Sequence, residues 1–388
     1  MDSQMYHFGQ FTDAYPPIMD GVSMTVKNYA LWLNRANAQS YVVTPRFPGY
    51  SDQDEFPVVR YFSAPVPGRQ PYRIGLPDLD ARIAHVLSDI PLSLVHAHSP
   101  FSAGMLATKT ARYNHIPVIA TFHSKYRDDF SRVTHQKSIL NQIMKKIVSF
   151  YEAVDEVWIP QRHVEETIRE YGYKGRLEVV DNGIDLGSIR NIQEYRTACR
   201  GLTGVPHGKK VFLYVGQLIL EKNLKFLVDS LSLLLDVDYT LYFVGQGYAR
   251  PVLERLSAEA GLSARIKFTG PVYDREELKR YYAMADLFLF PSLYDNAPLV
   301  VREAASLHTP SLLLKGSTAA EVIRDQFNGF LSDNEPAQYA RRIKEILMQP
   351  ETLKQTGENA SLTLCRTWEE IVQEVKDRYI HLIRRKMN

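Results

Sequence analysis

Short apolar runs alternate with helical segments along the whole chain. In the first half we predict strands at MYHFGQF, QSYVVTP, LSLVHAH, IPVIATFH, EVWIP and LEVVDN, with helical stretches such as SMTVKNYALWLNRA, AGMLATKTARYN and HVEETIREYG between them. After a loose polar stretch, IRNIQEYRTACRGLTGVPHGKK, strands resume at KVFLYVG, YTLYFVG, RIKFTG, LFLFPS, PSLLLK and GFLS. Strand–helix alternation of this kind predicts an α/β fold with doubly wound parallel sheets.

The restart of the pattern near Lys209 indicates two α/β domains in tandem, which a chain of 388 residues can accommodate. We place the first domain at residues 1–190 and the second at residues 205–365. A last helix, from about Trp368 to Arg385, carries apolar residues at helical spacing and can pack on either domain: Ile371, Val375, Tyr379, Leu382 and Ile383.

Composition and charge narrow the function classes. The formal net charge is +2, so nothing in the composition demands a nucleic-acid partner. The N-terminal stretch has neither the basic nor the apolar region of a signal peptide, and no apolar run approaches a membrane span. The two cysteines, Cys199 and Cys365, fit neither a metal spacing nor a disulfide framework. We therefore expect a cytoplasmic protein.

Ligands of open parallel sheets bind at the carboxyl ends of the strands, so the loops there are the places to search. DAYPPIMDGVSMTV follows the first strand and opens the first helix, with Gly21 at the turn. The N–H groups of Val22 and Ser23, together with the helix dipole, would favour an anion such as phosphate. An ordinary cap or turn is the alternative reading.

Two successive strand ends of the first domain carry histidines. HAHSPF places His96 and His98 on one side of a strand end, because strand side chains alternate, and His123 follows the next strand in ATFHSKYRDDF. A His-x-His pair can bind a metal, but no third ligand stands at a recognisable spacing. We expect hydrogen bonds to a polar ligand, against the alternative of a histidine that is hydrogen-bonded within the fold.

The second domain begins with YVGQLILEKN, in which Lys222 follows Gly216 by six residues. A lysine near a glycine loop can neutralise phosphate, although a solvated lysine is an equally good reading. FVGQG repeats the strand–glycine arrangement at Gly245 and Gly247. Without a third glycine at the Rossmann spacing, this is a poor dinucleotide fingerprint.

PSLYDNAPLVVREAA places Asp295 and Glu303 eight residues apart, after a buried strand and around the start of a helix. Helix N-termini offer N–H groups to phosphate, and carboxylates accept hydrogen bonds from the hydroxyls of sugars and ribose. Two unrelated surface charges are the alternative. At this position the pattern favours a pocket for a phosphorylated polyol.

The order of these motifs resembles that of retaining glycosyltransferases of the GT-B, family 4 type. The resemblance covers nearly the whole chain: DGV, HSPF, TFHS, VVDNGID, YVGQLILEKN, FVGQG, IKFTGPV, LFLFPSLYDNAPLVVREAAS, TAAEVIRDQFNGFL and TWEEIV. The acid-x7-Glu pattern of Asp295 and Glu303 is the most specific element. The resemblance implies two Rossmann-like domains facing a cleft, with a closing helix at about residues 366–388 that packs back on the first domain.

The resemblance implies a hexosyltransferase with a nucleotide-sugar donor, a UDP-sugar, held by the second domain and an acceptor held by the first. No tightly bound cofactor and no metal are expected. His123 and Asp295 would be catalytic, and His98 and Lys125 would lie on the acceptor side. The donor would be bound by Gly21, Gly216, Gln217, Lys222, Val272, Asp295, Ala297, Pro298, Leu299 and Glu303.

Three residues depart from the pattern of the resembled family. Asp295 stands where a glutamate is usual, Pro298 replaces a glycine, and Gln217 replaces an arginine that would contribute a phosphate cation. Arg302 or Lys315 would be the substitutes for that missing charge.

TDAYPPIMDGV, HSPFSAG, TFHSKYRDDF and PYRIGLP look most like bacterial diacylglycerol glycosyltransferases, which implies a glycerolipid acceptor and peripheral contact with the inner face of the cell membrane. RVTHQKSILNQIMKKIVSFYEAV carries an apolar stripe from Ile139 to Tyr151, with lysines elsewhere, as a helix at an anionic membrane does. A core-facing helix with solvated lysines is the alternative. A soluble, polysaccharide or cell-envelope acceptor, a sugar-nucleotide epimerase and a non-catalytic binder are the other functions we weigh.

Overall fold

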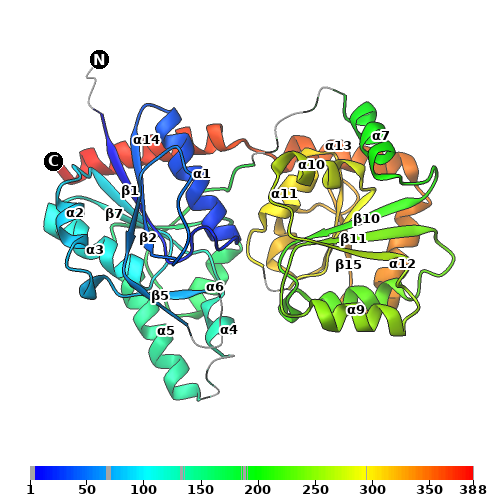
Figure 1. Cartoon of the computed structure of the whole chain (residues 1–388), viewed down its shortest axis with the longest axis horizontal. Coiled ribbons are helices and arrows are strands. Elements are labelled where there is room, and N and C mark those ends of the chain that lie inside the picture. The colour runs from blue at the N-terminus through cyan, green and yellow to red at the C-terminus, as the bar shows by residue number, and fades with distance from the viewer. Residues whose placement is uncertain are drawn as a thin grey trace. The chain divides into compact units, whose positions relative to one another are not determined.

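The computed structural model describes residues 5–66, 71–131, 134, 136–184, 186, 189, 191–293 and 295–387. Six residues of the stretches quoted above lie outside these ranges: Arg132, Val133, His135, Asp185, Arg190 and Tyr294. The chain divides into two compact units (Figure 1): unit 1 comprises Met1–Asn182 and Trp368–Asn388, and unit 2 comprises Gly183–Thr367.

Unit 1 contains a seven-stranded parallel sheet in the order β3-β2-β1-β6-β7-β8-β9. Six of its strands are the predicted ones. β3 was not predicted, because a short edge strand with three half-buried residues has a weak apolar pattern. The sheet strands are β1 (His7–Phe11), β2 (Gln39–Pro45), β3 (Val58–Tyr61), β6 (Leu94–Ala97), β7 (Val118–Thr121), β8 (Glu156–Ile159) and β9 (Leu177–Val179), and β4 (Ser63–Pro65) and β5 (Arg73–Gly75) form an antiparallel pair.

Helices accompany these strands in unit 1. The last, α14, packs along α1 (Figure 1), and its Tyr379 ring stacks on Trp158 at 5.6 Å between ring centroids. The helices are α1 (Gly21–Arg35), α2 (Ile83–Ser88), α3 (Ser102–Asn114), α4 (Tyr126–Ser131), α5 (Lys137–Glu152), α6 (Val164–Glu170) and α14 (Trp368–Met387), with a 3-10 turn η1 at Pro77–Leu79.

Unit 2 contains a six-stranded parallel sheet in the order β12-β11-β10-β13-β14-β15. Every one of these strands was predicted. Its central strands are almost wholly buried, as expected where helices cover both faces of a parallel sheet. The strands are β10 (Lys210–Val215), β11 (Tyr239–Val244), β12 (Ile266–Gly270), β13 (Leu287–Phe290), β14 (Ser311–Leu314) and β15 (Phe330–Ser332).

The polar stretch before β10 is not loose, contrary to our prediction, because it forms helix α7 (Ile192–Thr203). Asn191 caps this helix by accepting from the Glu194 N–H at 3.2 Å, and Cys199 on the helix itself is buried. The apolar stripe is too narrow to stand out in the sequence. The other helices of unit 2 are α8 (Leu224–Leu231), α9 (Arg250–Glu259), α10 (Arg275–Met284), α11 (Leu299–Ser306), α12 (Pro336–Leu347) and α13 (Pro350–Leu364), with 3-10 turns η2 (Leu220–Lys222) and η3 (Thr318–Val322).

The α/β prediction, with parallel sheets in two domains, is thus confirmed. Within the described residues, none of the helices is both long and apolar enough to span a membrane.

Gly245 and Gly247 allow the loop after β11 to pack closely against the backbone of the loop after β10. A Cβ on Gly245 would lie 1.9 Å from the Gly216 carbonyl oxygen, and one on Gly247 would lie 2.2 Å from that of Leu218. Gly245 also has a φ of +143°, a conformation that other residues rarely adopt. The Gly-x-Gly of FVGQG therefore serves backbone packing between two strand-end loops.

Candidate functional site

The loops after β10 and β13 meet in unit 2, because these strands are neighbours in its parallel sheet. Lys222 ends the turn η2 after β10, and Asp295 follows β13. The Lys222 ammonium donates to Oδ1 of Asp295, and both side chains are largely buried. Two residues that the sequence analysis selected separately therefore form one charged pair.

The second carboxylate oxygen of Asp295 has no partner in the part of the chain that the structure describes. Oδ2 is buried and accepts no hydrogen bond from the described residues. A buried carboxylate oxygen without a donor costs free energy, on the order of 1–3 kcal/mol or more. Asp295 therefore has one acceptor oxygen that none of the described residues satisfies.

Helix α11 begins directly beyond this pair. Pro298 is its N-cap and offers no N–H, so the first helical donor is Leu299, and Val301 already bonds the Pro298 carbonyl at 3.3 Å. Ala297, Pro298 and Leu299 are all half-buried. The predicted anion-binding role of this segment stays a prediction.

Glu303 lies one turn further along α11 and is bound from helix α10. Arg275 Nη2 donates to Oε1 of Glu303 at 2.9 Å, and the Tyr282 hydroxyl donates to Oε2 at 2.8 Å. Sequence reasoning missed both partners. The i, i+7 spacing of Arg275 and Tyr282 places them on one helix face, but nothing local shows that this face meets Glu303.

The remaining donor-side predictions lie around the same strand ends. Gly216 has a φ of +149°, and its N–H donates to the Val244 carbonyl at 3.0 Å. The Gln217 carbonyl accepts from the Tyr214 hydroxyl at 3.1 Å, and Val272 packs half-buried against the core of unit 2. Their roles toward a ligand stay predictions.

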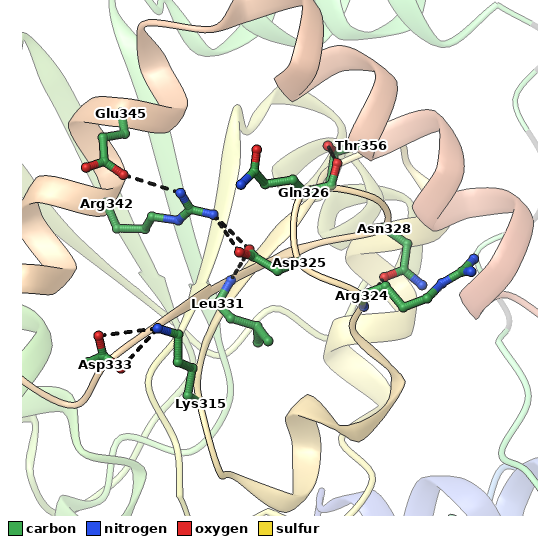
Figure 2. Close-up of polar contacts among 10 residues, drawn as sticks. All are labelled: Lys315, Arg324, Asp325, Gln326, Asn328, Leu331, Asp333, Arg342, Glu345 and Thr356. Carbon is green, nitrogen blue, oxygen red and sulfur yellow. Dashed lines mark hydrogen bonds and ion pairs between the residues drawn. The ribbon is translucent and has the colours of Figure 1, made fainter.

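Arg302 and Lys315, suggested as substitutes for the arginine that Gln217 replaces, both bind other groups. Arg302 is buried and donates to the Leu364 carbonyl at 3.0 Å, which ties α11 to the end of α13. Lys315 pairs with Asp333 at 3.1 Å, and Figure 2 shows this pair beside the bidentate contact of Arg342 with Asp325. These contacts hold the loop between β14 and β15, so neither suggestion is supported.

The histidines of unit 1 form a connected group at the ends of β6 and β7. His98 Nδ1 lies 3.1 Å from His123 Nε2, and His98 Nε2 lies 2.9 Å from Gln10 Oε1. His96 is buried beneath them, with its ring centroid 4.1 Å from that of His98. Burial lowers the pKa of His123 to about 4 and holds the pKa of His96 and His98 well below 6.5. All three rings are therefore neutral at pH 7.

The anion site predicted at the start of α1 loses its stated donors. Asp20 caps this helix, and its carboxylate accepts from the Ser23 N–H at 2.8 Å and also from Val22. Because an internal carboxylate takes the Ser23 N–H, that donor no longer supports phosphate binding, and the role of Gly21 toward a ligand stays a prediction. Gly21 itself is exposed, with open space where a Cβ would stand.

A carboxylate that we did not single out organises the neighbouring loop. Asp13 accepts from the hydroxyls of Ser99 and Ser102 and from the Ala103 N–H, so it joins the end of β1 to the start of α3. Burial raises the pKa of Asp13 despite these bonds. A small pocket beside it is lined by Asp13, Tyr15, Ile18, Thr44, Pro45, Phe47, Arg60 and Arg73.

Lys125 and helix α5 complete the acceptor-side predictions. Lys125 is half-buried and lies two residues after His123. Its backbone carbonyl accepts from the backbone N–H groups of Asp128 and Asp129 at the start of α4. The apolar stripe of α5 is buried at Ile147 and Tyr151, but Ile139 is 42% exposed near the N-terminal end. Within the described residues, no group of three or more His, Cys, Asp or Glu side chains is arranged to hold a metal.

Two family models match most of the chain. Residues 19–188 match Glycosyltransferase Family 4, and residues 197–363 match Glycosyl transferases group 1. The alpha-monoglucosyldiacylglycerol synthase of Streptococcus pneumoniae is 24% identical over 354 residues, which are 90% of this chain and 80% of that protein. The synthase of the same name from Acholeplasma laidlawii is 24% identical over 375 residues, 92% of each chain.

The solved structures agree on the fold. HepE from Anabaena, in complex with UDP and glucose, superposes with a TM-score of 0.76 at 18% identity and covers 97% of this chain and 99% of its own. The chain therefore belongs to the GT-B glycosyltransferases, with a family 4 domain followed by a group 1 domain.

Proposed function

We propose that this glycosyltransferase is a retaining enzyme that moves a hexose from a UDP-sugar to a hydroxyl of a membrane glycerolipid such as diacylglycerol. The observation that carries the donor half is Oδ2 of Asp295, which has no partner among the described residues, while Lys222 holds the other oxygen. A hydroxyl of the donor sugar supplies the missing hydrogen bond. HepE, of the same fold, was solved with UDP and glucose, which supports a UDP-sugar.

Each residue of the donor half then has a role. An ammonium group has three N–H donors, so Lys222 can hold Asp295 and also donate to a diphosphate oxygen. Glu303, oriented by Arg275 and Tyr282, accepts from the ribose hydroxyls through its remaining lone pairs. Gly216 and Gln217 approach the phosphates, the segment from Ala297 to Leu299 faces the sugar and its phosphates, and Val272 lies beside the base.

The proposed transfer is a front-face displacement. The bond between the sugar C1 and the phosphate oxygen breaks, and the acceptor oxygen bonds to C1 on the same face. The acceptor proton goes to the leaving phosphate oxygen. His123, neutral at pH 7, lies on the acceptor side with His98 and Lys125 and stabilises the positive charge that develops on the sugar.

The acceptor half rests on helix α5 and on the relatives. Two relatives that align over most of the chain are named alpha-monoglucosyldiacylglycerol synthases. In α5 the exposed lysines Lys137, Lys145 and Lys146 accompany the exposed Ile139. Figure 1 shows α5 extending from unit 1 beyond the edge of its sheet. A basic, partly apolar helix end suits the surface of an anionic membrane, so we propose peripheral binding there.

Release of UDP from a panel of sugar nucleotides, with diacylglycerol in mixed micelles, tests the donor half. We expect Asp295→Asn to lower kcat/KM by about 100-fold, since the amide replaces an acceptor by a donor, while the Kd for UDP alone changes little. The matched control is Asp333→Asn, which alters an exposed strand-end aspartate of the same unit. Wild-type turnover in Asp295→Asn, or no UDP release from any donor, would contradict the proposal.

Vesicle flotation tests the acceptor half. We expect the protein to float with vesicles that contain phosphatidylglycerol and to stay behind with pure phosphatidylcholine. Ile139→Asp and the pair Lys145→Glu and Lys146→Glu should each reduce flotation several-fold, whereas Lys225→Glu on α8 should not. Equal flotation of all variants would remove α5 from the membrane contact, and no flotation would point to another acceptor.

A further inference from the structure

A buried chain of polar side chains connects His123 to the last helix of unit 1. From His123 it passes through His98 to Gln10 of β1, and the Gln10 amide Nε2 donates to the Tyr379 hydroxyl at 3.4 Å. Tyr379 of α14 lies 2.5 Å from His96 Nδ1, and His96 Nε2 lies 2.7 Å from Thr121 Oγ1. The two series of hydrogen-bonded side chains meet at Gln10, whose side chain is fully buried.

The members of this chain differ in how they can bond. A neutral imidazole carries one N–H and one lone pair, and a hydroxyl can donate and accept, so each can serve in either direction. The glutamine amide has a distinct acceptor and donor end. The Gln10 oxygen faces His98 and its NH₂ group faces Tyr379. The Gln10 amide thereby determines the direction of the hydrogen bonds that run through His98 to His123.

The direction follows bond by bond. Because Gln10 Oε1 can only accept, the single proton of neutral His98 resides on Nε2, and the His98 Nδ1 lone pair accepts from His123 Nε2–H. His123 then presents an Nδ1 lone pair rather than an N–H at its other ring nitrogen. On the opposite side, Tyr379 accepts from Gln10 and also contacts His96, which contacts Thr121 through its other ring nitrogen.

We propose that Gln10 is a positioning residue of the transferase, which holds His123 in the Nε2–H tautomer, with a lone pair and no proton on Nδ1. A lone pair on Nδ1 favours a positive charge that develops on a nearby sugar carbon, whereas an N–H at this nitrogen would oppose that charge. This inference rests on the proposed role of His123, but the tautomer itself is a property of unit 1 alone.

The direct test is the ring ¹⁵N spectrum of the full-length protein, labelled at histidine and recorded at pH 7.5. His98→Gln and His123→Gln assign the two resonances. We expect both rings to be neutral with the proton on Nε2. A proton on Nδ1 of His123, or an even mixture of tautomers, overturns the proposal whether or not the enzyme is active.

Kinetics separate positioning from a merely structural role. Gln10→Met keeps the length of the side chain but removes the acceptor. We expect mixed tautomers at His123, a kcat reduced about tenfold, and a donor KM within about twofold of wild type. The matched control is Thr121→Val, which removes the last partner beyond His96 and leaves Gln10, His98 and His123 in place. An equal loss in both variants, or an unchanged tautomer in Gln10→Met, contradicts the proposal.

Failure of this inference is distinguishable from failure of the proposed function. If no sugar nucleotide releases UDP while the ¹⁵N spectrum shows the Nε2–H tautomer, the proposed function fails and the positioning by Gln10 stands as a structural fact. If turnover proceeds while His123 carries its proton on Nδ1, the reverse holds.

Discussion

At the scale of single residues, the hydrogen-bond partners of Asp295 and Glu303 indicate how each carboxylate can bind a ligand. Lys222 binds one oxygen of Asp295, and no described residue binds the other, whereas both oxygens of Glu303 are held by side chains of α10. The first arrangement leaves an unfilled acceptor for a ligand. The second fixes the direction of a carboxylate, which is what a residue that reads a ribose needs.

The Tyr282–Glu303 bond gives a prediction at this scale. Tyr282→Phe removes one donor to a buried carboxylate, so we expect UDP binding to weaken by about 1–2 kcal/mol, or ~5- to 30-fold in Kd by calorimetry. Tyr281→Phe, on the adjacent position of α10, is the control and should bind UDP as wild type does. Equal affinities for Tyr282→Phe and wild type would show that Glu303 does not bind the nucleotide.

At the scale of elements, the strand-end loops of unit 2 approach each other backbone to backbone. The Gly216 carbonyl occupies the space that a side chain at Gly245 would need, and Gly245 lies in the left-handed region. This packing holds the loop after β10, and therefore Lys222, against the loop after β11. Gly245 therefore supports the site through backbone packing, which positions the loop that carries Lys222.

The prediction for this element is a stability change. We expect Gly245→Ala to lower the free energy of unfolding of unit 2 by at least about 3 kcal/mol, from overlap with a carbonyl oxygen added to backbone strain. Gly201→Ala in α7 is the control, since nothing lies within 4 Å of its added Cβ. It should change stability by less than about 1 kcal/mol and in the stabilising direction. Urea unfolding followed by circular dichroism measures both, and equal midpoints would refute the packing argument.

At the scale of the whole molecule, the two units carry different chemistry. Unit 1 buries the neutral histidines His96 and His98 beside His123, whereas unit 2 holds the ion pairs of the proposed donor pocket. All three tryptophans, Trp32, Trp158 and Trp368, belong to unit 1. Tryptophan fluorescence therefore reports unfolding of unit 1, while circular dichroism reports both units.

This division predicts a stronger pH dependence in unit 1, which contains three histidines with lowered pKa values, than in unit 2, where burial lowers the pKa of His308. Because the folded rings have lowered pKa values, the unfolded chain binds more protons, so unit 1 loses stability as pH falls from about 6.5 toward 4. Asp13 and Asp20 act in the opposite direction, since burial raises their pKa values. His98→Gln removes one histidine contribution and leaves these carboxyls. We expect its fluorescence midpoint in urea to fall less than that of wild type between pH 7.5 and 5.

The same comparison has a clear negative outcome. If wild type and His98→Gln lose stability in parallel over this pH range, the buried histidine does not contribute through its proton. A loss seen equally in the circular dichroism transition of unit 2 would place the cause elsewhere in the chain.

The sequence by itself determined the order of strands and helices, the two-domain α/β class and the family. It also determined that acids, a lysine and histidines stand at strand ends. These features depend on the spacing of apolar residues and on short motifs, which neighbouring residues carry. The β3 edge strand and helix α7 were not predicted from the sequence, because few of their side chains are buried.

Only the tertiary structure decided which polar groups meet. Gln10 contacts Tyr379 across 369 positions, and Lys222 contacts Asp295 across 73. Gln10, a polar residue inside the apolar strand HFGQF, could have been selected from the sequence. The sequence does not show which residues it contacts. Likewise, Asp20 claims the N–H groups that we had assigned to phosphate. Local patterns set the elements, whereas hydrogen-bond partners depend on contacts that only packing of distant segments brings about.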